Sequence, residues 1–155
     1  MWLWSEKTYF SFDDGGRVEA FHSFQDETQF LPLAESLAKR AVDEVQRIRS
    51  HFRTVDAVAR HLVAKTPKGF WHQFHTAVAC GLSGYKPDAE RYFGEVMGTS
   101  ATQDWEREAV SLAREYNTLK EDVSAFRQRI TEIVLGARDA LKLAKISEVR
   151  FDAKD

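Results

Sequence analysis

Residues 105–144 read WEREAVSLAREYNTLKEDVSAFRQRITEIVLGARDALKLA, and this stretch decides the fold. Apolar residues recur along it at alternating steps of four and three, from Trp105 to Ala144, without a break. This spacing places one apolar seam along a helix and is typical of helices that pack side by side at a shallow angle. Such a helix is roughly 60 Å long, whereas a domain of this size has a radius of gyration of about 15 Å. The pattern therefore predicts one long helix over residues 100–146 that either protrudes and pairs with another chain, or bends.

The middle of this seam carries bulky apolar side chains, which we expect to contact a partner protein. These residues are Leu112, Tyr116, Leu119, Val123, Phe126, Ile130 and Ile133. Burial of the seam against a second copy of the chain would make the protein a homodimer, with the pairing direction left open by the charges beside the seam. The alternative is that the seam packs against the chain's own helices, two of which end to end could cover it. Asn117–Thr118 and Gly136 are the sites where the helix could kink.

The first 25 residues are rich in aromatic side chains and predict a β-hairpin. Asp13-Asp14-Gly15-Gly16 is a turn signal, flanked by candidate strands over residues 7–12 and 17–24. A two-stranded hairpin alone is marginally stable in water, so it must lie on the helices or join a partner's strand. Trp2 and Trp4 cannot be buried by a hairpin, and we expect them to contribute to a partner-binding surface.

Residues 26–98 predict four shorter helices. The first carries an apolar stripe from Leu33 to Phe52, with Pro32 expected in its first turn, where proline is tolerated. Thr54 is a good N-cap for the second helix. The third is expected over residues 70–82, and Pro87 opens a fourth that Gly98 ends. Together these features predict a mainly α single domain over residues 1–155: a helical bundle with one long C-terminal helix and a short N-terminal hairpin.

Composition describes an ordinary globular protein. Lys and Arg total 22 against 24 Asp and Glu, and a net charge of −2 argues against attraction of the whole protein to nucleic acid or anionic membranes. Cys80 is the only cysteine, which excludes an intrachain disulfide and fits a reducing compartment. The start of the chain resembles no signal peptide, and no apolar run reaches the roughly 20 residues of a membrane span. We therefore expect a cytoplasmic location and no membrane contact.

Few residues suggest catalytic or metal chemistry. His72 and His75 lie three apart on one predicted helix and could both reach a metal, but no third ligand is nearby in sequence. Packing of the two rings among aromatic neighbours is the better interpretation. Cys80 has no base at a suitable spacing and is best read as a buried thiol. The sequence contains no phosphate-binding glycine loop and no nucleophile elbow. We expect no cofactor, no metal and no catalytic residue.

One region has a distinct charge. Residues 39–68 contain eight basic side chains and three acidic ones. A basic patch can follow phosphates, so a nucleic-acid-binding protein is an alternative hypothesis. It would use Arg40, Arg47, Arg49, Arg53 and Arg60. The simpler interpretation is a solvated helix face.

These observations favour a non-enzymatic protein–protein interaction module, expected to be a homodimer of the small bacterial type. An immunity or inhibitor protein that masks another protein's active site fits them, as does a subunit of a larger assembly. Nucleic-acid binding through the basic region is the first alternative. An all-α metal-dependent hydrolase that uses His72 and His75 is a more remote one.

Overall fold

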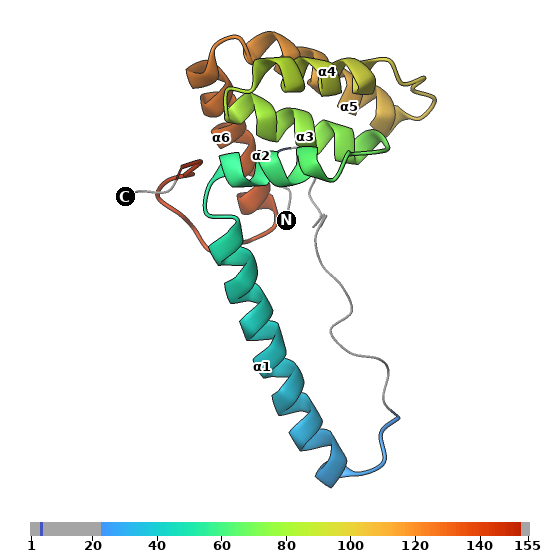
Figure 1. Cartoon of the computed structure of the whole chain (residues 1–155), viewed down its shortest axis with the longest axis vertical. Helices are drawn as coiled ribbons and strands as arrows, with labels where there is room; N and C mark the ends of the chain where they lie inside the picture. The colour runs from blue at the N-terminus through green and yellow to red at the C-terminus, as the bar shows by residue number, and fades with distance from the viewer. Residues whose placement is uncertain (1–3, 5–22, 153–155) are drawn as a thin grey trace. The chain divides into compact units, whose positions relative to one another are not determined.

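The computed structural model describes residue 4 and residues 23–152, and these residues contain six helices and no strand (Figure 1). The prediction of a mainly α-helical fold is therefore confirmed. The chain divides into two compact units, one formed by residues 14–53 and the other by residues 1–13 together with residues 54–155. Each unit is described by itself. The predicted hairpin lies outside the described residues except for Ser23 and Phe24, which are irregular.

The first unit contains helix α1, Glu27–His51. Asp26 is its N-cap, and its carboxylate accepts a hydrogen bond from the backbone N–H of Gln29 at 2.9 Å. The helix therefore starts earlier than predicted, and Pro32 lies inside it rather than in its first turn. The prediction for Pro32 was wrong because Asp26 caps the helix more than one turn before the proline. None of the residues of α1 is buried.

Helix α3, Phe70–Leu82, is the centre of the second unit. Its residues from Phe74 to Leu82 are all buried, because α3 packs against α2, α4 and α6. Figure 1 shows α2, Val55–Ala64, and α4, Lys86–Met97, on either side of α3. A helix that is covered on several sides is apolar most of the way round. The bounds of α2, α3 and α4 agree with the sequence prediction, and the Thr54 hydroxyl caps α2 by accepting from the N–H of Ala57 at 3.1 Å.

A tight turn joins α3 to α4. Gly84 has a φ of 77°, a left-handed conformation that glycine adopts without strain because it has no Cβ. The N–H of Tyr85 donates to the carbonyl of Cys80 at 2.8 Å, and the N–H of Gly84 donates to that of Gly81 at 3.1 Å. These two bonds form a Schellman motif, which satisfies the last carbonyls of α3. The turn thereby starts α4 antiparallel to α3, with Pro87 in its first turn.

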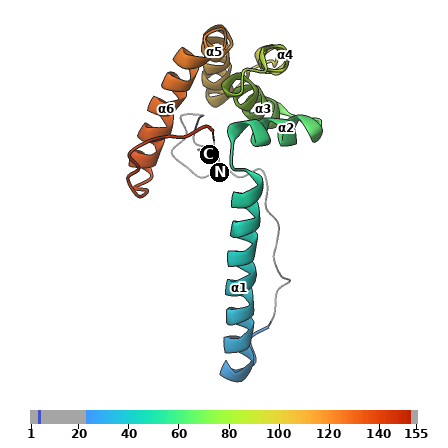
Figure 2. The ribbon, with the colours of Figure 1, turned by 60° about the vertical axis from the view of Figure 1, so that its left-hand side comes forward.

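The predicted continuous helix over residues 100–146 is wrong. Residues Asp104–Leu119 form α5 and residues Val123–Ala140 form α6, and Figure 2 shows them as two separate rods. The helix breaks at residues 120–122 and not at Asn117 or Gly136, the expected kink sites. Asp122 causes the restart, since its carboxylate accepts from the N–H groups of Ser124 and Ala125 at 2.9 and 3.1 Å. The break allows α5 to pack against α4 while α6 packs against α3.

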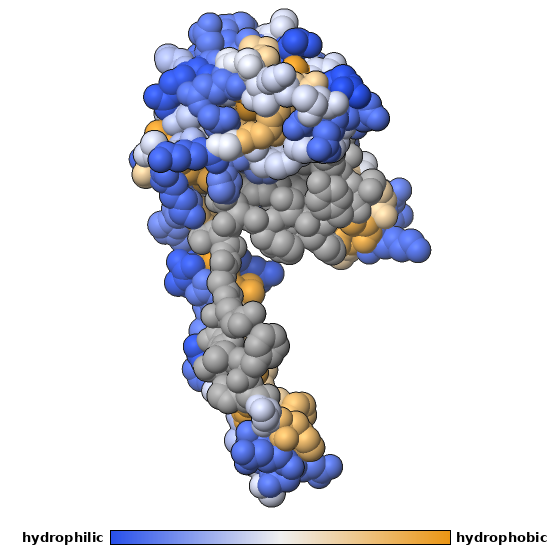
Figure 3. Space-filling view, turned by 90° about the vertical axis from the view of Figure 1, so that its right-hand side faces the viewer, coloured by the Kyte–Doolittle hydropathy of each residue, from blue (hydrophilic) through white to orange (hydrophobic). Residues whose placement is uncertain are grey.

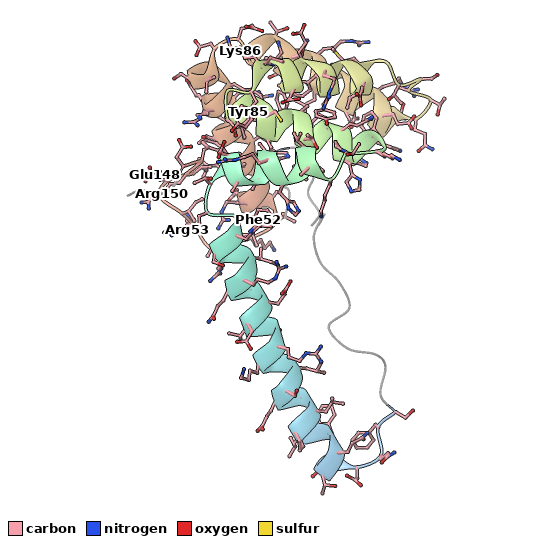
Figure 4. All side chains as sticks on the ribbon, in the orientation of Figure 1. Phe52, Arg53, Tyr85, Lys86, Glu148 and Arg150 are labelled. Atoms are coloured by element: carbon pink, nitrogen blue, oxygen red, sulfur yellow. The ribbon has the colours of Figure 1, made fainter. Side chains whose placement is uncertain are left out.

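The chain after α6 packs back against the helices of the second unit. The carbonyl of Phe151 accepts from the N–H of Val55, the first residue of α2, at 2.7 Å. Arg127 of α6 pairs with the Asp152 carboxylate at 2.8 Å and donates to the carbonyl of Leu82 at 3.1 Å. The C-terminal segment therefore connects the beginning of α2 to the end of α3 and to α6. Figure 4 labels Glu148 and Arg150 of this segment, which form an ion pair at 3.0 Å.

Candidate functional site

Helix α1 carries a regular apolar stripe. Its residues, called the α1 stripe below, are Phe30, Ala34, Leu37, Ala41, Val45, Ile48 and the C-cap residue Phe52. The steps between them average about 3.67 residues, which is the period of an 11-residue repeat. Such a stripe runs almost straight along a helix, because its period is close to the 3.6 residues of one helical turn.

No residue of the α1 stripe is buried: Phe30, Ala41 and Val45 are exposed, and the other four stripe residues are half-buried. Phe30 is 52% exposed and Val45 is 47% exposed, and beside the stripe Leu31 and Val42 are more exposed still. Figure 3 shows hydrophobic surface at the N-terminal end of α1, and Figure 4 shows side chains standing out along its length. Most helical stability in proteins comes from packing an amphipathic face against a neighbour. A contiguous apolar face of this kind makes α1 a candidate interaction surface.

Charges divide α1 into two ends of opposite sign. Residues 26–38 contain three acidic side chains, of Asp26, Glu27 and Glu35, and no basic one. Residues 45–53 contain Arg47, Arg49 and Arg53 and no acidic side chain. Between these ends, ion pairs within the helix join Lys39 to Asp43 at 2.9 Å and Arg47 to Glu44 at 2.7 Å. The helix is thus acidic at its beginning and basic at its end.

The predicted seam of residues 105–144 lies elsewhere, in the core of the second unit. Tyr116, Phe126 and Ile130 are fully buried there, Leu112 and Ile133 are nearly so, and Leu119 and Val123 are partly buried. Phe74 of α3 lies 6.1 Å from Tyr116, between ring centroids. The seam therefore packs against the chain's own helices, which was the alternative interpretation of the sequence.

Trp4 belongs to the second unit and packs against its core, whereas Trp2 lies outside the described residues. The Trp4 indole N–H donates to Nδ1 of His75 at 3.1 Å, and the Tyr116 hydroxyl donates to the Trp4 carbonyl at 3.1 Å. His75 also stacks on Trp71, which in turn stacks on Trp105. The indole N–H and the carbonyl of Trp4 therefore both form hydrogen bonds within the chain. Sequence reasoning missed this site, because nothing in the primary structure indicates which ring an N-terminal tryptophan will contact.

The other residues considered for chemistry are His72, His75 and Cys80, all on α3. Burial lowers the pKa of His75 to about 3, helped by the nearby His72, so His75 is neutral and accepts from Trp4. His72 is exposed, and its Nδ1 lies 3.2 Å from the carbonyl of Lys68. Burial raises the pKa of the Cys80 thiol to about 12, which keeps it protonated. Among the described residues no group of three or more His, Cys, Asp and Glu side chains could hold a metal ion.

The basic residues do not share one face. Arg40 and Arg47 are seven residues apart and lie on the same side of α1, whereas Arg49 lies nearly opposite Arg47 at 100° per residue. Arg60 belongs to the second unit, where it pairs with Asp56. Ion pairs with acidic neighbours reduce the charge offered to phosphates. Nucleic-acid binding stays a prediction, which a gel-shift titration across salt concentrations would test.

A hollow of about 670 Å³ lies at the junction of α2 and α3. Its lining residues are Leu62, Lys65, Thr66, Pro67, Lys68 and His72. The two lysines and the imidazole give it a basic character, and no carboxylate lines it.

Comparison of the chain with protein-family models, with curated proteins and with solved structures gives no match. No helix in the described part of the chain combines the length and the apolar character that crossing a bilayer requires.

Proposed function

We propose that this protein is a non-enzymatic protein–protein interaction module and that the α1 stripe is its docking surface. The observation that carries the proposal is that α1, 25 residues long, has an unbroken apolar stripe and no buried residue. Burial of apolar surface contributes about 25 cal/mol per Å², so a partner that covers the stripe gains several kcal/mol. This interface replaces the seam of residues 105–144 as the expected contact.

The remaining candidate chemistry supports an interaction role over catalysis. Cys80 is buried and protonated, and the imidazole of His75 is committed to Trp4. A nucleophile needs a base within hydrogen-bond reach and access to substrate, and Cys80 is 0% exposed. The helix-in-groove mode of recognition, by contrast, requires only an amphipathic helix with apolar residues at i, i+3, i+4 and i+7. The α1 stripe meets that requirement.

A site-specific photo-crosslinker tests the proposal in the full-length chain. The crosslinking amino acid replaces Val45 in the α1 stripe or, as the control, Asp43, which lies about 160° away around the same helix. Both variants are irradiated in cells that naturally make the protein, and their adducts are identified by mass spectrometry. We expect adducts to protein chains from position 45 at a yield at least tenfold higher than from position 43.

The identity of the adduct decides the outcome. Adducts that join position 45 to a second chain, whether a copy of this protein or another protein, support the proposal. Equal yields from positions 45 and 43 would show that the stripe has no preferred contact and would refute it. Adducts only within the same chain would also refute it, since they would show the stripe to be covered by the protein's own residues.

A further inference from the structure

We infer that the occupant of the α1 stripe is the α1 stripe of a second copy, running antiparallel, with a twofold axis at Ala41. This inference rests on the proposed function and names its partner. Two properties of α1 carry it: the spacing of the stripe residues and the distribution of charge along the helix.

The spacing of the α1 stripe is the same in both directions. From Phe30 to Phe52 the steps are four, three, four, four, three and four residues, and Ala41 is the midpoint. A copy rotated about an axis at Ala41 aligns residue i with residue 82 minus i. Phe30 then lies beside Phe52 of the copy, and Leu37 lies beside Val45 of the copy. Every stripe residue thereby meets another stripe residue.

The side chains at these positions suit a close antiparallel pair. Ala41 meets Ala41 of the copy at the centre, where small side chains let the two helices approach closely. Aromatic residues meet at both ends, where helices that cross at a shallow angle diverge and larger side chains fill the wider gap. Phe30 and Phe52 are therefore placed where a pair of aromatic rings contributes most, about 0.5–1.5 kcal/mol beyond its buried area.

The charge distribution distinguishes an antiparallel from a parallel pair. An antiparallel copy aligns the acidic residues 26–38 with the region that holds Arg47, Arg49 and Arg53. In a parallel, in-register copy the opposite flanks of the two stripes would meet, which would place Arg47 of one chain near Arg49 of the other. Like charges in such positions destabilise a helix pair, and antiparallel helix dipoles attract. Arg40 and Glu44 share one flank of the stripe, so the antiparallel copy also brings each Arg40 near the other chain's Glu44.

The size of the stripe sets the expected strength of the dimer. Helix α1 is about 37 Å long, and contact along its full length buries roughly 500 Å² per copy, near the lower limit for specific interfaces. We therefore expect a dissociation constant in the micromolar range. Sedimentation equilibrium of the full-length protein should show reversible dimerisation over about 5–500 µM, which brackets that range.

Engineered disulfides test the register. Cys80 is fully buried and does not compete with new thiols. Under oxidation we expect Ala41→Cys to cross-link with itself. Ala34→Cys alone should give no cross-link, whereas a mixture of Ala34→Cys with Ile48→Cys should give the mixed dimer. Gln46→Cys, on the opposite side of α1, is the control and should stay monomeric on denaturing gels.

A charge substitution tests the stripe without a covalent bond. Leu37→Glu should raise the dimer dissociation constant at least tenfold, and adding a Val45→Lys chain should restore a mixed dimer, because the antiparallel register pairs these positions. Gln46→Glu is the matched control and should change dimerisation less than twofold. Circular dichroism checks that all variants keep their helix content.

The outcomes separate this inference from the proposed function. A monomer up to about 500 µM, far above micromolar dissociation constants, overturns the antiparallel dimer. Self-linked Ala34→Cys without the mixed product overturns the register in favour of a parallel pair. If the dimer tests fail in this way but the photo-crosslinker at position 45 gives adducts to other proteins, the α1 stripe is still a docking surface. Its partner is then another protein and not a second copy of this chain.

Discussion

Mildly acidic solution should destabilise the fold through His75, because the unfolded chain binds a proton there that the folded protein does not. His75 is 3% exposed, and its Nδ1 accepts the indole proton of Trp4 at 3.1 Å. A protonated imidazole donates from both nitrogens, so it can no longer accept from Trp4. Burial lowers the pKa of His75 in the folded protein to about 3, whereas an unfolded chain has a histidine pKa of about 6.5.

The sign and size of the effect follow from these two pKa values. Below about pH 6.5 the unfolded chain takes up a proton at His75 that the folded protein does not bind, so the free energy of unfolding falls as pH falls towards about 3. One pKa unit corresponds to 1.36 kcal/mol. Lowering the pH from about 7.5 to about 5.5 should therefore remove about 1.4 kcal/mol through this residue alone. Carboxylates contribute little in that window, because their ordinary pKa values of about 4 lie below it.

Urea denaturation followed by tryptophan fluorescence at both pH values measures this loss. His75→Asn keeps an acceptor oxygen close to the position of Nδ1 but does not titrate. We expect it to lower the free energy of unfolding at both pH values and to reduce the pH-dependent loss by about 1.4 kcal/mol. His72→Asn removes an exposed imidazole one turn away and should leave most of the loss in place.

Two results would contradict this reasoning. If wild type and His75→Asn lose the same free energy between the two pH values, His75 does not remain neutral in the folded protein. If His72→Asn abolishes the loss instead, the titrating group has been assigned to the wrong ring. Comparing differences within each variant cancels the packing cost of the substitutions themselves.

Further substitutions test helix packing and helix ends, with urea midpoints as the measurement. Gly81→Ala should lower the free energy of unfolding by about 1–3 kcal/mol, because the new Cβ would lie 2.6 Å from a ring carbon of Phe126 in α6. Gly136→Ala meets nothing within 4 Å and should raise the free energy of unfolding by up to about 1 kcal/mol. If both glycine substitutions changed the free energy of unfolding in the same direction, the close contact between α3 and α6 would be disproved. Gly84→Ala should cost about 1 kcal/mol at its φ of 77°, and Lys142→Gly, at a φ of 52°, should gain a similar amount. Asp122→Ala removes the α6 cap and should cost about 1 kcal/mol; no change would mean that packing alone positions the α5–α6 break.

Local signals in the sequence predicted the middle of the molecule well. The bounds of α2, α3 and α4 follow from residues adjacent to each helix end, such as the Thr54 cap and the Gly98 stop. These signals act over three or four residues, so they can be read without knowing the rest of the fold. Asp122 is a signal of the same kind, but the uninterrupted apolar seam across it favoured the prediction of a continuous helix.

The sequence predicted the candidate site less well than it predicted the helices. The stripe of α1 was visible, but its partner was not, since a stripe on α1 and the seam of α5 and α6 have nearly the same period. The contact of Trp4 with His75 joins residues 71 apart in the chain, and no local pattern encodes such a contact.

The sequence by itself determined most of the residues that form helices and the apolar face of each helix, because periodicity and capping depend on neighbouring residues. Only the tertiary structure decided that Tyr116, Phe126 and Ile130 belong to the chain's own core while the α1 stripe has no buried residue. The physical reason is that burial of an apolar side chain stabilises a protein equally whether its own chain or another covers it. The apolar pattern of a helix predicts that one of its faces is covered. Only the arrangement of the helices shows whether the protein's own chain covers that face.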